Sequence, residues 1–106
     1  FTWDTQNLEQ DIASAEAGWA VCKKLLQDPT VHVILLDELN IVLKMNYLNT
    51  EMVLKDIASR PPMQHVIVTG RGAPDAVSDA ADTVSRIDDV KHAFRAGIKA
   101  QKGIEL

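Results

Sequence analysis

The sequence lacks the features that mark secreted, membrane-spanning and nucleic-acid-binding proteins. Its 106 residues include a single cysteine, Cys22, which cannot form an internal disulfide, so the composition suits a reducing cytoplasm. No apolar run approaches the roughly 18 residues that a membrane span needs, and no basic-then-apolar leader is present. The 11 lysine and arginine residues are scattered rather than clustered, and the net charge is -4. We therefore expect a cytoplasmic protein that binds neither membranes nor nucleic acids.

Several motifs for catalysis are missing as well. The three histidines, His32, His65 and His92, have no metal-ligand spacing, and we interpret them as structural or exposed. Serine, histidine and aspartate residues form no recognisable nucleophile arrangement, so no side chain is expected to act as a covalent catalyst. The phosphate-binding loop (P-loop) Gly-x-x-x-x-Gly-Lys-Ser/Thr is absent from the sequence. Its absence is the main obstacle to interpreting the chain as a nucleotide-binding protein.

The sequence does contain helical patterns. Apolar residues at steps of three and four predict an amphipathic helix that ends at Asp28-Pro29 and buries one stripe, formed by Leu8, Ile12, Ala15, Trp19, Cys22 and Leu26. Helical spacing predicts a second helix over residues 39–48. A third is predicted from Asn49 or Thr50 to Arg60-Pro61-Pro62, with three residues inward, Met52, Val53 and Ile57. A short helix from Pro74 to about Asp82 follows.

Short apolar and β-branched runs predict strands over residues 31–36, 65–69 and 83–87. The first two are apolar on both faces, as strands buried in parallel sheets are. Helices that alternate with such strands predict an α/β fold with a parallel sheet, in one domain over residues 1–106. Because three strands make a thin sheet with exposed edges, we expect further strands upstream of residue 1. The tail over 91–106 carries Gly97 and Gly103, and is expected to be irregular or partly helical.

Polar residues follow the first two predicted strands at the edge where open α/β sheets bind ligands, outside the carboxyl ends of the strands. Asp37 and Glu38 end the first strand and are suited to hold Mg²⁺ directly or through water, as the acidic pair of P-loop nucleotide enzymes does. The alternative is a solvated helix start, which also favours acids. Thr69 and a glycine-rich turn end the second strand, where Arg71 is suited to clamp a phosphate. The alternative there is a plain turn with a solvated arginine.

The first seven residues contain one of the two phenylalanines, Phe1, and one of the two tryptophans, Trp3. A large apolar pair at a chain end is costly to expose to water. We therefore expect this terminus to be cut out of a longer protein, and the two rings to cover a flat partner. Ordinary aromatic core packing is the alternative.

Five segments closely resemble, in the same order, the carboxyl half of the bacterial P-loop-type corrinoid adenosyltransferases, also called cob(I)alamin adenosyltransferases. They extend along the whole chain: residues 1–7 (Phe-Thr-Trp-Asp-Thr-Gln-Asn), 35–39 (Leu-Leu-Asp-Glu-Leu), 66–72 (Val-Ile-Val-Thr-Gly-Arg-Gly), 81–85 (Ala-Asp-Thr-Val-Ser) and 91–105 (Lys-His-Ala-Phe-Arg-Ala-Gly-Ile-Lys-Ala-Gln-Lys-Gly-Ile-Glu). Several independent motifs over the full length make the resemblance specific.

The resemblance implies transfer of the 5′-deoxyadenosyl group of ATP to the cobalt of a reduced corrinoid such as cob(I)alamin, with release of triphosphate, in adenosylcobalamin biosynthesis or salvage. It also implies part of a RecA-like P-loop fold, a three-layer α/β/α structure with a mainly parallel sheet. The N-terminal strands and the P-loop would then lie upstream of this sequence. A homodimer and a reductase partner such as a flavoprotein are expected.

The resemblance also assigns residues. Glu38, with Asp37 behind it, matches the acidic pair that helps to hold Mg²⁺ on the triphosphate. Phe1 and Trp3 match aromatics that press against the lower face of the corrin ring. Two further residues, Thr69 and Arg71, are inferred to lie on the nucleotide side.

The chain departs from the family pattern at Asn40-Ile41, where members often carry Thr-Tyr, and at Leu106, where an aromatic residue is usual. Two other interpretations stay open. One is a piece of another P-loop ATPase or kinase, which rests on Asp37-Glu38 and the strand order. The other is a non-catalytic corrinoid-binding module. Because the sequence has no P-loop, we expect this 106-residue chain to be inactive alone.

Overall fold

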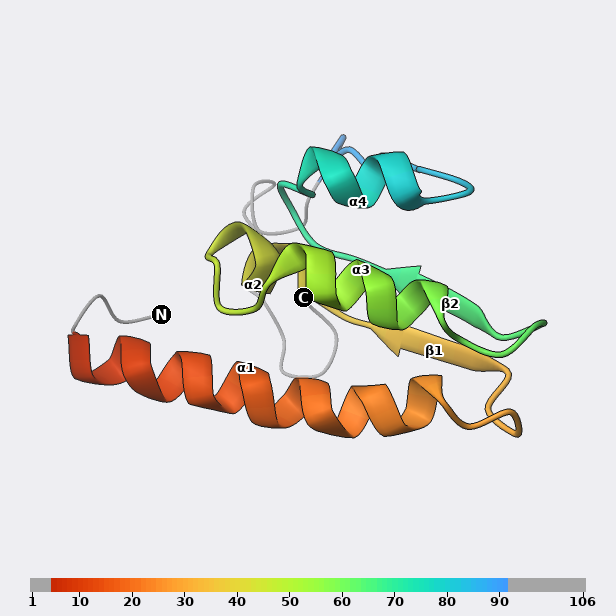
Figure 1. The fold of residues 1–106 in the computed structure, drawn as a ribbon. Helices are drawn as coiled ribbons and strands as arrows, with labels where there is room; N and C mark the ends of the chain where they lie inside the picture. The colour runs from red at the N-terminus through yellow and green to blue at the C-terminus, as the bar shows by residue number, and fades with distance from the viewer. Residues whose placement is uncertain (1–4, 92–106) are drawn as a thin grey trace.

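The computed structural model describes residues 5–91. Helices and strands follow one another along them in the order α1 (Thr5–Leu26), β1 (Val33–Leu36), α2 (Leu39–Lys44), α3 (Thr50–Ala58), β2 (His65–Val68) and α4 (Asp75–Ala80). Figure 1 shows α3 between α1 and α4, with the two strands behind it. This arrangement confirms an α/β fold in the part of the chain that the structure describes.

The two strands form a parallel pair. Val33 lies opposite His65, and Leu36 lies opposite Val68. Parallel strands need a crossover of about a dozen residues or more, and the segment with α2 and α3 provides it. Because the strands run in the same direction, the residues that follow Leu36 and Val68 meet at one edge of the sheet. The predicted parallel pairing is therefore confirmed.

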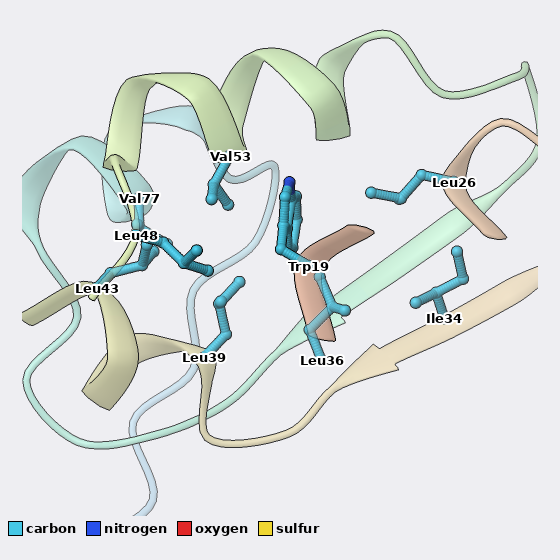
Figure 2. Packing of buried hydrophobic residues seen from close by; sticks show 9 residues of the cluster. All are labelled: Trp19, Leu26, Ile34, Leu36, Leu39, Leu43, Leu48, Val53 and Val77. Carbon is cyan, nitrogen blue, oxygen red and sulfur yellow. The ribbon is translucent and has the colours of Figure 1, made fainter. Parts of the chain in front are cut away.

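The hydrophobic core lies where α1 and α3 pack on β1. Figure 2 shows its buried side chains, which are Trp19, Leu26, Ile34, Leu36, Leu39, Leu43, Leu48, Val53 and Val77. The indole Nε1 of Trp19 donates a hydrogen bond of 2.8 Å to Oδ2 of Asp56, so the large ring is buried without leaving its polar atom unpaired. This bond ties α1 to α3 across the core.

The ends of the helices follow local sequence chemistry. The side chain of Asn49 accepts a hydrogen bond of 2.9 Å from the backbone N–H of Met52, so Asn49 is the N-cap of α3. Helix α2 ends at Lys44, four residues before the predicted end at Leu48. The chain turns there, and Asn46 adopts a left-handed φ of 59°. Asparagine tolerates this conformation better than most residues, which makes it a suitable stop.

The predicted strand over residues 83–87 is wrong. The segment is irregular and exposed, with Val84 64% exposed and Ile87 95% exposed. In the described part of the chain the sheet consists of β1 and β2 alone. An apolar, β-branched run becomes a strand only when a neighbouring strand supplies backbone hydrogen bonds. Here neither strand pairs with it.

Burial of the strands on both faces is also not observed. Ile34 and Leu36 point into the core, whereas Val33, Leu35 and Ile67 on the other face are 58%, 60% and 50% exposed. The reason is that the core cluster within residues 5–91 lies on one face of the strands only. The apolar pattern therefore predicts that both faces of the strands are buried, whereas residues 5–91 bury only one.

Three further side-chain predictions have mixed outcomes. Leu8 and Met52, both predicted to point inward, are 40% and 42% exposed. They lie near the amino-terminal ends of α1 and α3. Cys22 is half-buried and packs against the core cluster, as expected. Among residues 5–91, no helix is both long and apolar enough to cross a membrane.

Gln64 fastens the end of α1 to the start of β2. Its Nε2 lies 3.2 Å from the carbonyl oxygen of Leu25, 3.1 Å from that of Asp28 and 3.1 Å from that of Val31. The amide has two hydrogens, so it shares them among three acceptors. Carbonyls at the end of a helix lack partners within that helix. The carbonyl oxygens of Leu25 and Asp28 also accept backbone N–H bonds, from Asp28 at 3.2 Å and from Val31 at 3.1 Å. The buried glutamine therefore adds a second donor to these two carbonyls and supplies a donor to that of Val31.

We predict that Gln64→Leu lowers the free energy of unfolding by about 2 kcal/mol, because it removes a buried amide donor that three carbonyl groups share. The midpoint of urea unfolding measures the change. Gln27→Leu is the control, since Gln27 is exposed directly after α1, and its effect should stay within about 0.5 kcal/mol. Equal effects of the two substitutions would contradict the role given to Gln64.

Candidate functional site

The structure brings the acidic pair and Thr69 together at the carboxyl edge of the sheet. The hydroxyl of Thr69 donates a hydrogen bond of 2.7 Å to Oδ1 of Asp37. The same hydroxyl oxygen accepts a bond of 3.0 Å from the backbone N–H of Glu38. A residue that follows β2 therefore fixes both residues that follow β1. The contact places three of the residues singled out from the sequence side by side.

Asn40 is a further part of this edge, which the sequence analysis named only as a departure from the family pattern. Its backbone N–H donates to the carbonyl oxygen of Thr69 at 3.1 Å, and its Nδ2 donates to that of Gly70 at 3.0 Å. Asn40 is only 6% exposed, and its Oδ1 is buried without a partner within residues 5–91. The available signal was an amide side chain among the apolar residues of a short helix, directly after the acidic pair.

The glycine that follows Thr69 permits this close approach. Gly70 has a φ of 122°, and a Cβ added to it would lie 3.1 Å from Cβ of Asn40 and 3.3 Å from Cα of Glu38. Such contacts are tighter than ordinary van der Waals separations, so a side chain at position 70 would push the two turns apart. The turn after β2 and the turn after β1 are thus packed backbone to backbone.

Glu38 adopts a left-handed conformation, with φ 63° and ψ 14°. This region costs a residue with a side chain roughly 1–2 kcal/mol relative to the right-handed helix, and glycine avoids the cost. A glutamate retained at such a position is a strained residue of the kind that concentrates at functional sites. The conformation turns the chain from β1 into α2, next to the bond with Thr69.

The donor set at this edge fits Mg²⁺. Within residues 5–91, no group of three or more histidine, cysteine, aspartate or glutamate residues could hold a metal ion. Magnesium is typically held by one or two carboxylates, with waters and substrate phosphates completing its coordination. Asp37 and Glu38 are both exposed, and only Oδ1 of Asp37 is engaged by Thr69. Two carboxylates remain able to act together with a phosphate ligand.

The remaining sequence predictions have different outcomes. Arg71 is exposed in the turn that follows Thr69, so it lies at the predicted edge of the sheet. Its role toward phosphate remains a prediction. Phe1 and Trp3 lie outside the described residues, so their contact with a corrin remains a prediction. His32 and His65 are exposed, as expected, and His92 also lies outside the described residues.

We predict that Glu38→Gly is more stable than Glu38→Ala by about 1 kcal/mol, because glycine relieves the left-handed conformation while alanine retains it. Thermal or urea unfolding measures the difference. Glu51 in the first turn of α3 is the matched control, and there the order should reverse, since glycine disfavours a helix relative to alanine. If alanine were the better replacement at both positions, strain at Glu38 would be refuted.

Comparisons with known proteins match this chain to one family. A family model described as "ATP:corrinoid adenosyltransferase BtuR/CobO/CobP" matches residues 1–106. The corrinoid adenosyltransferase of Pseudomonas aeruginosa is 60% identical over 106 residues, which are 100% of this chain and 52% of that protein. Corrinoid adenosyltransferase CobA of Salmonella typhimurium is 48% identical over 105 residues, 99% of this chain and 54% of that protein.

The chain thus spans about half the length of the curated relatives it matches. These relatives carry the name of one enzyme, a transferase that acts on corrinoids. The family match nevertheless extends over every residue of the chain. The chain therefore belongs to the ATP:corrinoid adenosyltransferase family.

Proposed function

We propose that this chain is the carboxyl-terminal portion of an enzyme that transfers the 5′-deoxyadenosyl group of ATP to the cobalt of a reduced corrinoid such as cob(I)alamin. Triphosphate is the other product, and the reaction serves adenosylcobalamin biosynthesis or salvage. Membership of the family and the names of the relatives support the reaction class. The observation that carries the proposal is the bond from Thr69 to Asp37 beside Glu38, which builds an acidic edge suited to a metal–phosphate ligand.

In this reaction the electron pair on reduced cobalt attacks the ribose C5′ and forms the Co–C bond. The C5′–O bond breaks, and its electron pair leaves with the triphosphate. The cobalt is oxidised formally from Co(I) to Co(III). The protein need supply no covalent catalyst, because its task is to position two substrates and to stabilise the charge that grows on the leaving group.

The residues of this chain divide that task. Asp37 and Glu38 would hold Mg²⁺, which when bound supplies positive charge to the triphosphate. Thr69 donates to Oδ1 of Asp37 and so orients the carboxylate. Arg71 is a donor for phosphate oxygens at the same edge.

The corrin side of the proposal rests on the family resemblance. Phe1 and Trp3 would cover the lower face of the corrin ring and keep water and side-chain ligands away from cobalt. A cobalt centre without axial ligands is easier to reduce to its nucleophilic state. We further propose a RecA-like, three-layer fold for the complete protein, a cytoplasmic homodimer, and a reductase such as a flavoprotein as the electron donor.

The first test is Glu38→Gln in the full-length protein, with Glu51→Gln on the exposed start of α3 as the control. Removing the carboxylate charge should lower kcat/KM for adenosylation by about 100-fold or more, because charge stabilisation at the leaving group is lost. The control should match the wild type. The change in the corrinoid absorption spectrum follows the reaction.

The same assay separates the alternatives. Phosphate release from ATP without adenosylation would favour another P-loop ATPase or kinase. Corrinoid binding with no ATP-dependent chemistry would favour a non-catalytic binding module. A fully active Glu38→Gln protein would refute the role of the acidic edge.

A second prediction concerns the 106-residue chain by itself. It contains no P-loop sequence, and phosphate binding in such enzymes depends on the backbone amides and the lysine of that loop. We therefore expect no adenosylation of reduced corrinoid by this chain alone under conditions in which the full-length protein is active. Clear activity of the 106-residue chain would overturn the expectation.

A further inference from the structure

Lys44 lies against the glycine-rich turn that follows β2. Gly72 in that turn has a left-handed φ of 67°, and a Cβ added to it would lie 2.9 Å from Cδ of Lys44 and 3.0 Å from its Nζ. The lysine stem and its ammonium group therefore occupy the space that any other residue at position 72 would need. Since α2 ends at Lys44, the helix delivers this cation to the turn.

The ammonium group has no acidic partner in the described part of the chain. The ion pairs found within residues 5–91 join Lys23 to Asp56 and Arg86 to Asp88. Lys44 is exposed, and so is Arg71, the residue before Gly72. Two cations thus flank one glycine, and the charge of neither is neutralised by a carboxylate of these residues. A lysine near a helix C-terminus is favoured by the helix dipole, but the dipole does not explain why the Lys44 side chain lies against Gly72.

The cations and the acids lie on one continuous edge. Asp37 and Glu38 precede α2, Lys44 ends it, and the turn that Lys44 contacts follows Thr69, which holds the acids. Carboxylates repel an anionic ligand, and lysine and arginine repel a cationic one. A ligand that binds to this whole edge must therefore carry both positive and negative charge. A polyphosphate with bound Mg²⁺ is such a ligand, because the metal faces the carboxylates while the free phosphate oxygens face the ammonium group.

We propose that Lys44 is a binding residue for the polyphosphate chain of the nucleotide. Its side chain fits against Gly72 because glycine has no Cβ there. The identity of the ligand rests on the proposed function. The contact itself rests on the geometry of Lys44, Gly72 and Arg71. Lysine acts here as a point charge on phosphate, and its exposed position makes the contact sensitive to salt.

The experiment measures binding of tripolyphosphate with Mg²⁺ to the full-length protein by titration calorimetry. Lys44→Met keeps the apolar stem against Gly72 and removes the charge. We expect it to weaken binding about tenfold at low salt. Lys44→Arg should stay within about threefold of the wild type, because it retains the charge. The loss caused by Lys44→Met should shrink in about 0.5 M salt, as screening predicts.

Lys24→Met is the matched control. Lys24 is an exposed lysine in the last turn of α1. The end of α1 leads into the amino end of β1, so Lys24 lies away from the carboxyl edge of the sheet. Its variant should bind tripolyphosphate as the wild type does. Equal binding by Lys44→Met and the wild type would overturn the inference, as would equal weakening by Lys44→Met and Lys24→Met, since that would show a general charge effect.

The outcomes separate this inference from the proposed function. Normal adenosylation by the wild type, with tripolyphosphate binding that is unaffected by Lys44→Met, would leave the function and refute the role of Lys44. In the opposite outcome, the wild type adenosylates no reduced corrinoid, but Lys44→Met still weakens tripolyphosphate binding. That result would refute the proposed function and support the polyphosphate site.

Discussion

The hydroxyl of Thr69 is the contact on which the candidate site depends. It uses its donor on the carboxylate of Asp37 at 2.7 Å and an acceptor on the amide of Glu38 at 3.0 Å. A hydroxyl can do both at once, whereas a methyl group of similar size can do neither. Parallel pairing of the strands brings the two chain segments to one edge, but it does not set the orientation of side chains beyond the last ladder bond. The threonine supplies that orientation.

Stability and chemistry occupy different parts of this structure. The core between the helices and β1 is apolar, and Leu36 and Leu39 both belong to it. The acidic pair lies between these two residues, and Glu38, one member of the pair, adopts a left-handed conformation. The acidic pair thus lies between two buried leucines of the core. Asn40, which follows Leu39, is also buried, and its amide donates to the glycine turn. The polar residues of the site are therefore positioned by neighbours that belong to the core.

Local pattern was sufficient to predict the positions of the helices and of the two paired strands. The stripe of α1, the cap at Asn49 and the pairing of the two strands all follow from spacing and residue type. The prediction of a strand over 83–87 was wrong because a sequence pattern shows that a segment can pair, but not that a neighbouring strand is available. Asn40 and Gln64 were missed for a related reason. A buried amide is acceptable only where carbonyls from other elements converge, and no local pattern predicts that convergence. The placement of the acidic pair beside Thr69 needed only the direction of two strands.

The bond between Thr69 and Asp37 joins residues 32 positions apart. Closing a loop of that length costs conformational entropy before any contact offsets it. The site therefore cannot assemble while β1 or β2 stands alone, and it appears in the same step in which the crossover closes and the strands pair. Pairing of the two strands and formation of the site are therefore coupled in this chain. A partly folded molecule that has not closed the crossover carries the two carboxylates without the hydroxyl that organises them.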